Sequence, residues 1–371
     1  MKQLARDGED WIWLVDHSNQ IGQEKLLQII GIRAKDLRPI GETLPRGKMV
    51  VLATVPGTSW TRDDVRREYK KLAAQLGPPK YVVTGGAVEL FESADALEIE
   101  GKTPIVLRDM KHYAANVFEQ LIGKDERFTQ YLSQLGRTRS AVQQTELSHF
   151  TPPPQKPKAR FMNLGPVLRW GQMVSYHLSH CHSQSRAGIT AARMNEKLGW
   201  VRGFGDDLAA WSRCQEVMQA SLAFINRHGI YRGAAAQLQA KLDDVRTARA
   251  TDCELSRAMA AKLIAFVEES ASKIPVGDRA WLSTENLESL FGQYKRLEGQ
   301  HSKGGFTSLI AAMPMLLTDW TAAQVRTNFA AVPVKTMKQW LADNLGTTLT
   351  AKRATAYQEF KKNTAQPKNT G

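Results

Sequence analysis

Short apolar runs alternate with polar turns along the first third of the chain. Residues 11–16 read Trp-Ile-Trp-Leu-Val-Asp, an aromatic and β-branched run that is typical of a buried strand and ends in a carboxylate. Two more apolar runs follow at residues 26–32 and 49–55. The turn residues and short connections between the three runs predict an antiparallel meander.

The pattern then becomes mixed. Residues 61–76 have a Thr at the N-cap position, acids in the first turn and an apolar stripe, and Gly-Pro-Pro follows, so this segment predicts a helix. A fourth strand is predicted at 81–84, a helix at 88–97 and a fifth strand at 104–108. This order is that of an RNase H-like α/β domain with a mixed five-stranded sheet, although the pattern also permits other α/β arrangements.

From Met110 onward the pattern is helical almost without interruption. Residues 151–160 form a proline-rich basic connector that cannot continue a helix. Further helices are predicted at about 163–182, 187–198, 206–227, 231–247 and 253–272. The expected organisation is a first part of the α/β domain at 1–124, an all-helical insertion at 125–280, a final α/β part at 281–318, and a basic helical C-terminal region at 319–371 with a frayed tail.

The charge of the chain favours a polyanionic partner. Lys and Arg number 50 against 37 Asp and Glu, giving a formal net charge of +13, a field that attracts DNA. The excess is largest near the C-terminus, where residues 291–371 hold eleven Lys or Arg against four acids. Net charge alone is weak evidence for a nucleic-acid partner, because many basic proteins bind none.

The cysteines and the apolar runs indicate in which cellular compartment the protein is expected. Cys181, Cys214 and Cys253 are widely separated and odd in number, which fits a reducing compartment. No run has the length of a membrane span and the first ten residues lack the apolar stretch of a signal peptide. We expect a cytoplasmic, nucleoid-associated protein with no membrane partner.

Two acids stand where metal-dependent phosphoryl transfer needs them. Such chemistry uses carboxylates that hold two cations about 3.5 to 4 Å apart, and Mg²⁺ or Mn²⁺ suits oxygen ligands. Asp16 ends the first strand, and Glu288 lies in a helical run with Lys295 seven residues later, so Glu288 can hold metal while Lys295 contacts a phosphate. The alternatives are an Asp16 that caps the following turn, an amphipathic surface helix with incidental charges, or Glu285 as the ligand.

Two motifs resemble those of a known family. The segment Ser283-Thr-Glu-Asn-Leu-Glu-Ser-Leu-Phe-Gly-Gln-Tyr-Lys295 is similar to the Glu-bearing motif of bacterial insertion-sequence DDE transposases. Asp109-Met-Lys-His112 resembles the Asp-x-x-His motif after strand five in the Mutator and hAT-like groups, which also carry a helical insertion before the final Glu. Each motif alone is weak, and their order and spacing over about residues 10–310 make the resemblance.

The resemblance implies a function and partners. The activity it implies is DNA transposition by metal-assisted hydrolysis and strand transfer, with Asp16, Asp109 and Glu288 as catalytic metal ligands. His112 and Lys295 would support them or bind phosphate. The implied partners are double-stranded transposon ends and further copies of the chain on DNA. Because the first predicted strand begins about ten residues from Met1, we expect the helix-turn-helix domain of the family to be supplied by another chain or lost by truncation.

The chain departs from the family at the fourth strand. The family usually has an Asp there, whereas this chain reads Thr84-Gly85-Gly86, so Gly85 occupies the second Asp position. In the family topology strand four lies beside strand one and strand five one further out, which puts Asp109 about 10 Å from Asp16. Asp109 is therefore a metal ligand only if the strands are aligned differently; otherwise Asp109 and His112 are supporting or structural residues. Glu89 is a poorer substitute for the missing Asp, because it lies on the following helix.

Gly85 leaves three functions open. The chain is an active transposase, an inactive DNA-binding relative of one, or a structure-specific nuclease on the same fold. Losing one metal carboxylate costs orders of magnitude in rate, whereas DNA binding can survive the loss.

Weaker motifs lie in the predicted insertion. Several His and Cys residues gather at one helix end, where a helix-end cluster is the better interpretation and zinc binding the alternative: His177, His180, Cys181 and His182. Trp170, Trp200 and Trp211 are interpreted as core packing, with base stacking as the alternative. Basic residues in and near the connector either contact phosphates or are simply solvated: Lys156, Lys158 and Arg160, with Arg137 and Arg139 before it.

Overall fold

The computed structural model describes residues 8, 10–17, 25–37, 42, 46–155, 160–180, 189–247, 253–300, 308–317, 321–344 and 349–365. The chain forms two compact units: Met1–Asp109 with Ala280–Gly371, and Met110–Arg279. The first break thus follows Asp109, whereas a break after residue 124 was expected. The reason is that helix α3 (Met110–Ile122) packs against other helices of the second unit.

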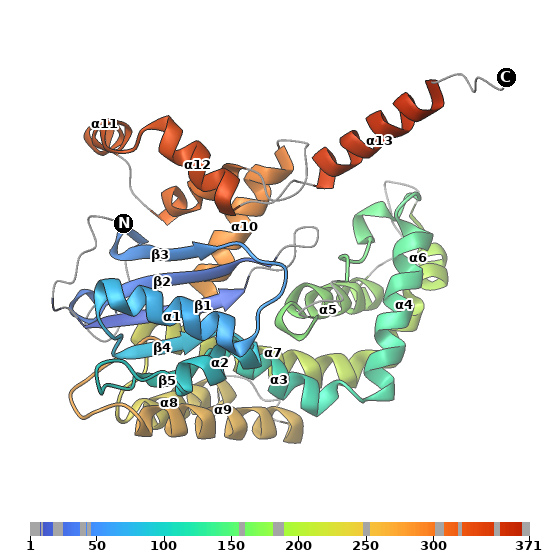
Figure 1. Cartoon of the computed structure of the whole chain (residues 1–371). Helices are drawn as coiled ribbons and strands as arrows, with labels where there is room; N and C mark the ends of the chain where they lie inside the picture. Colours follow the sequence, from blue (N-terminus) through green and yellow to red (C-terminus); the bar gives the residue numbers. More distant parts are fainter. Residues whose placement is uncertain are drawn as a thin grey trace. The chain divides into compact units, whose positions relative to one another are not determined.

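A mixed five-stranded sheet forms the centre of the first unit (Figure 1). Its strands are β1 (Trp11–His17), β2 (Leu27–Arg33), β3 (Met49–Val55), β4 (Tyr81–Thr84) and β5 (Ile105–Arg108). Their order is β3-β2-β1-β4-β5, with β1, β2 and β3 antiparallel and β4 and β5 parallel to β1. The predicted meander and the predicted position of strand four beside strand one are both confirmed.

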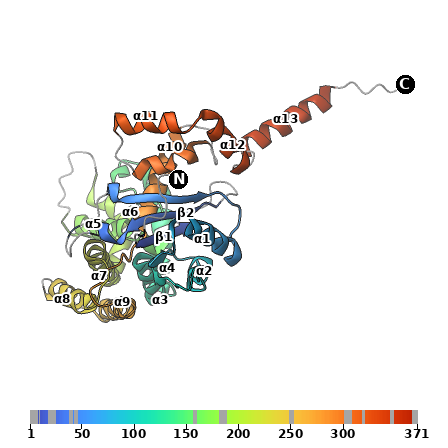
Figure 2. The same cartoon turned by 60° about the vertical axis from the view of Figure 1, so that its left-hand side comes forward.

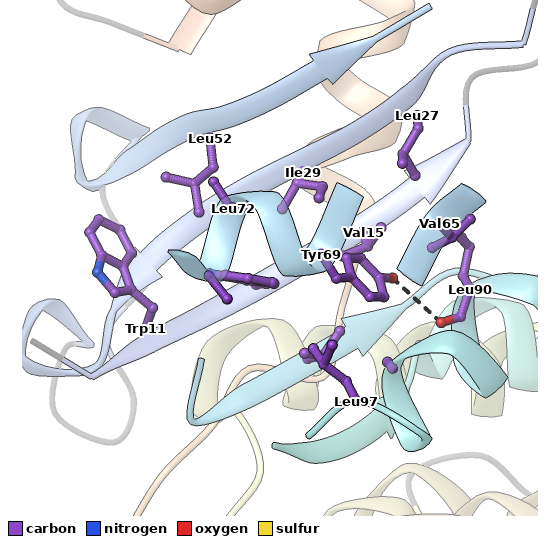
Figure 3. Packing of buried hydrophobic residues seen from close by; sticks show 14 of the residues in the cluster. Trp11, Val15, Leu27, Ile29, Leu52, Val65, Tyr69, Leu72, Leu90 and Leu97 are labelled. Atoms are coloured by element: carbon purple, nitrogen blue, oxygen red, sulfur yellow. Dashed lines mark hydrogen bonds between the residues drawn. The ribbon is translucent and has the colours of Figure 1, made fainter. Parts of the chain in front are cut away.

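Helices α1 (Arg62–Leu76) and α2 (Val88–Asp95) cover one face of this sheet. α1 begins with a capping box, in which the Thr61 side chain accepts from the Asp64 amide and the Asp64 carboxylate accepts from the Thr61 amide. Tyr69 of α1 is fully buried beside the Trp13 ring, and its hydroxyl donates to the Leu90 carbonyl at 3.4 Å (Figure 3). The apolar stripe predicted for this helix therefore faces the sheet core.

The rest of the first unit is helical. Helix α10 (Glu285–Gln300) contacts β1 and passes behind the sheet in the view of Figure 1. It is followed by the 3-10 segment η6 (Ser308–Leu317) and the helices α11 (Ala322–Ala331), α12 (Val334–Asn344) and α13 (Leu349–Ala365). Two short 3-10 turns, η1 (Ala34–Asp36) and η2 (Arg46–Lys48), lie between β2 and β3 along the chain.

The described residues of the second unit form helices and 3-10 turns and no named strand. After α3 come α4 (Glu126–Val142), η3 (Ser148–Phe150), η4 (Arg160–Met162), α5 (Gly165–His180), α6 (Ala191–Leu198), η5 (Gly199–Phe204), α7 (Gly205–His228), α8 (Ala234–Thr247) and α9 (Glu254–Ser272). The long helix α7 packs against α5, α8 and α9, and α8 and α9 lie side by side (Figure 2).

Aromatic side chains fill the core of this second unit. Trp211 and Trp170 are buried, and the Trp170 indole donates to the Phe150 carbonyl at 2.8 Å. Trp200 is half-buried and donates to the Thr138 hydroxyl at 2.9 Å. The interpretation of the three tryptophans as helical packing is confirmed. None of the described helices combines the length and the apolar character that crossing a membrane requires.

Candidate active site

Three positions form a row at the carboxyl ends of β1, β4 and β5. Val15 pairs with Thr84, which pairs with Arg108, so the next residues of the three strands are Asp16, Gly85 and Asp109. Backbone hydrogen bonds continue the row, because the Gly85 amide donates to the Val15 carbonyl and the Asp109 amide to the Thr84 carbonyl, each at 2.9 Å.

The row lies on the face opposite α1 and α2. Successive side chains of a strand point to opposite faces, and Trp13 and Val15 belong to the core under α1. Asp16 therefore points to the other face, with its neighbours Gly85 and Asp109. Because β4 lies between β1 and β5, one strand separates the two acids, as the sequence predicted.

Gly85 gives the Asp16 carboxylate its space. Asp16 is 9% exposed, and its Oδ1 accepts a hydrogen bond from the His17 amide at 2.8 Å. A Cβ atom on Gly85 would overlap Oδ1 of Asp16 and lie 2.6 Å from its Cγ. The carboxylate thus occupies the volume that any side chain on β4 would need at this position. The turn at 18–19, which Asp16 would cap in the alternative interpretation, lies outside the described residues.

Asp109 holds the start of helix α10. It is 1% exposed, and its Oδ2 accepts a hydrogen bond from the buried Thr284 amide at 2.5 Å. The Thr284 carbonyl in turn accepts from the amides of Leu287 and Glu288 in the first turn of α10. This geometry supports the structural alternative stated for Asp109, because one carboxylate oxygen is already engaged by the backbone.

Glu288 lies in the first turn of α10, and the helix docks as predicted. Its apolar residues Leu287, Leu290, Phe291 and Tyr294 are buried, and α10 contacts β1, the strand that carries Asp16. Lys295 lies on the same helix two turns later. Its role toward a phosphate stays a prediction, as does the role of Glu288 toward a metal.

The predicted ligands do not assemble into a full cation site. Among the residues that the structure describes, no group of three His, Cys, Asp or Glu side chains could hold a metal ion. Gly85 supplies no ligand between Asp16 and Asp109, and Asp109 is engaged with Thr284. The residues therefore do not fit the two-cation arrangement that was predicted for Asp16, Asp109 and Glu288.

A cluster that the sequence did not reveal lies on the other face of the sheet. The Glu89 carboxylate lies 2.9 Å from the Lys25 ammonium and 3.2 Å from Nε2 of His17, and the His17 ring stacks on Trp60 at 5.9 Å. Glu89 therefore does not replace the missing acid at Gly85. The alternation of β1 was the available signal, because it directs His17 away from the face of Asp16.

Burial sets the charges of this cluster. Burial, and then the Lys25 ammonium, lower the pKa of His17 to about 4, so its ring is neutral at pH 7. Burial opposes ionisation of Glu89, but the hydrogen bond from Lys25 outweighs it with the help of further interactions, and the pKa of Glu89 is lowered. The cluster is thus a Lys–Glu ion pair with a neutral imidazole beside it.

The other predicted site residues lie in the second unit. His112 is in α3, whereas Asp109 belongs to the first unit. His177 contacts Phe150, and Nδ1 of His180 lies 2.8 Å from the Tyr176 carbonyl, while Cys181 and His182 fall outside the described residues. The Arg139 guanidinium of α4 donates to the Pro152 carbonyl of the connector. Lys156, Lys158 and the Arg160 side chain are not among the described parts.

Comparison with known proteins gives a weak likeness to solved structures. No family model matches the chain, and no curated protein does. Among solved structures, it is similar to the Drosophila P element transposase strand transfer complex, with a TM-score of 0.41 and 8% identity over 83% of this chain and 76% of that one. A likeness of this size says nothing about the chemistry of the site.

Proposed function

We propose that the chain is a DNA-binding protein built on the RNase H-like scaffold of a DDE transposase, without metal-dependent strand transfer in its present form. The observation that carries the proposal is the row Asp16, Gly85, Asp109. It has the layout of a carboxylate site, but its middle position is a glycine and its last is engaged with the Thr284 amide.

The arrangement of elements supports the scaffold. The sheet order β3-β2-β1-β4-β5 is the order expected for an RNase H-like domain. A helical unit, Met110–Arg279, is inserted between β5 and the helix that carries Glu288, as the resemblance to Mutator and hAT-like transposases implies. That Glu288 helix contacts the strand that carries Asp16.

The side chains argue against catalysis. In phosphodiester transfer two cations stabilise the attacking oxygen and the leaving oxygen, and their charge and position account for most of the rate enhancement. Mg²⁺ is usually held by one or two carboxylates together with waters and substrate oxygens. Asp16 on β1 has no carboxylate beside it on β4, so the row supplies fewer ligands than a pair of cations needs.

Charge supports DNA as the partner. A formal net charge of +13 favours contacts with phosphates, and such binding weakens as salt rises because bound counterions are released. We expect copies of the chain to associate on DNA, as the resemblance implies for transposases.

The strand-transfer enzyme is the second candidate. The observation that favours it is the nearly buried Asp16 on a strand that contacts the Glu288 helix. In this candidate Mg²⁺ or Mn²⁺ is the cofactor, and Asp16 and Glu288 remain the ligands.

One experiment separates the two candidates. Duplex DNA binding is measured in EDTA, and nicking of supercoiled plasmid is measured with Mg²⁺ or Mn²⁺, for the unchanged chain, Gly85→Asp and Gly85→Ala. We expect salt-sensitive binding and no nicking by the unchanged chain. Gly85→Ala is the matched control, because it adds the same Cβ against Asp16 without a carboxylate.

Two results would overturn the proposal. Nicking by the unchanged chain that disappears in Asp16→Asn would establish the enzyme instead. Absence of duplex binding at about 50 mM salt, where phosphate contacts are strong, would remove the DNA-binding function. Nicking that appears only in Gly85→Asp would support the transposase origin together with the loss of the ligand.

A further inference from the structure

Helix α13 exposes two large aromatic side chains. Tyr357 is 67% exposed and Phe360 is 66% exposed. Every residue of α13 from Lys352 to Lys362 is exposed, so this stretch has no buried face. A helix with two exposed aromatic rings is unusual, because packing of an apolar face normally stabilises a helix in a protein.

The aromatic residues share one face with two cations. At 3.6 residues per turn, Arg353, Tyr357, Phe360 and Lys361 fall within an arc of about 100°. The remaining charges of the stretch, Lys352, Glu359 and Lys362, project from the opposite side. We call the first set the aromatic-basic face of α13.

This combination of groups matches one kind of ligand. Guanidinium and ammonium groups pair with phosphates, and aromatic rings stack on bases whose flat faces are accessible. The rise of 1.5 Å per residue separates Tyr357 and Phe360 by about 4.5 Å along the axis, which suits two consecutive bases. In a duplex the faces of the bases are covered by their neighbours, and only the phosphates and base edges are accessible.

We propose that the aromatic-basic face of α13 binds single-stranded nucleic acid, with bases stacked on Tyr357 and Phe360 and phosphates paired with Arg353 and Lys361. This goes beyond the proposed duplex binding and does not depend on it. It involves none of the residues of the row at Asp16, and it needs no cation.

Other occupants fit the face less well. A second copy of the same helix would bring like charges together. A membrane surface is bound by helices with a broad apolar face, whereas this face presents only two aromatic rings.

The test is fluorescence anisotropy in EDTA with labelled oligothymidine, oligouridine and a duplex, each of about 15 residues or base pairs. Three double variants are compared: Tyr357→Ala with Phe360→Ala, Arg353→Gln with Lys361→Gln, and Lys352→Gln with Lys362→Gln. The last pair is the matched control, because it removes the same charge from the opposite face. All six positions are exposed, so the fold is expected to persist, and circular dichroism checks it.

We expect the aromatic pair to weaken single-strand binding about tenfold or more, since each stacked base contributes about 1–3 kcal/mol, and to change duplex binding less than about twofold. The Arg353 and Lys361 pair should weaken single-strand binding more than its control. The two single strands show whether DNA or RNA is preferred.

The proposal is overturned if the unchanged chain binds neither single strand, or if the aromatic pair leaves single-strand binding intact. Equal losses for single strand and duplex, or equal losses in the two charge variants, overturn it as well. Duplex binding that survives any of these results leaves the DNA-binding function standing, so the two proposals fail separately.

Discussion

The hydrogen bond between Asp109 and Thr284 makes a sharp prediction. Asp109→Ala removes the acceptor 2.5 Å from the Thr284 amide, and Thr284 is 0% exposed, so water does not replace it. A hydrogen bond to a charged group contributes about 1.5–3 kcal/mol, and an unpaired buried donor costs about 1–3 kcal/mol. Because the two ranges describe overlapping effects, we expect a loss of roughly 3 kcal/mol.

Asp109→Asn is the matched control. The amide has nearly the same shape and keeps one oxygen that can accept from Thr284, so only the charge assistance is lost, which costs about 1 kcal/mol. Urea unfolding gives the stability of each variant. Hydrogen exchange of the amides at the start of α10 reports locally, and exchange should be faster in the Ala variant than in the Asn variant.

The sign of the effect separates two roles of Asp109. If Asp109 served mainly as a cation ligand, its charge would repel neighbouring acids in EDTA, and either substitution would leave the protein as stable as before or more stable. Stability that is unchanged or increased in Asp109→Ala would therefore refute the structural role, as would equal losses in the Ala and Asn variants.

Two more predictions concern pH and packing. The pKa of His17 is lowered to about 4 from its usual 6.5. Between these pH values the His17 ring is protonated in the unfolded chain but neutral in the folded protein. The free energy of unfolding therefore has its full value above pH 6.5 and falls by roughly 3 kcal/mol towards pH 4. His17→Gln should flatten the unfolding free energy over this window, and an unchanged slope would contradict the assignment; the lowered pKa of Glu89 acts at lower pH. In the second unit, a Cβ on Gly171 would lie 2.5 Å from the Tyr131 hydroxyl and 2.7 Å from Leu208, so Gly171→Ala should lower the thermal midpoint and cost about 1–3 kcal/mol. An unchanged midpoint would show that the helices separate easily.

The local pattern was enough to predict the sheet and its covering helices. β1 has a continuous apolar stretch before Asp16, and the Thr61 cap marks the start of α1. The apolar side of α10 also follows from helical periodicity, and its residues are buried as expected. In these cases the information lies within one turn or one strand, where periodicity acts.

The contacts of the site required information that the local pattern does not contain. Asp109 and Thr284 are 175 positions apart, and no local rule selects which backbone amide a buried carboxylate contacts. The boundary after Asp109 was missed for a similar reason. α3 has an apolar face, but periodicity does not identify which unit covers it.

The insertion of Met110–Arg279 has a consequence for synthesis of the protein. β1 to β5 leave the ribosome first, but the helix that covers β1 follows only after the whole second unit, since Asp109 and Thr284 are 175 positions apart. At typical elongation rates of about 5–20 residues per second, this delay lasts about 9 to 35 s. During that time the sheet face that carries Asp16 lacks α10, and its apolar residues can associate with other chains or with chaperones. Slow codons in the segment that encodes α3 to α9, or a chaperone that acts while this segment is being translated, would therefore change the yield of folded first unit. The residues of that segment belong to the second unit.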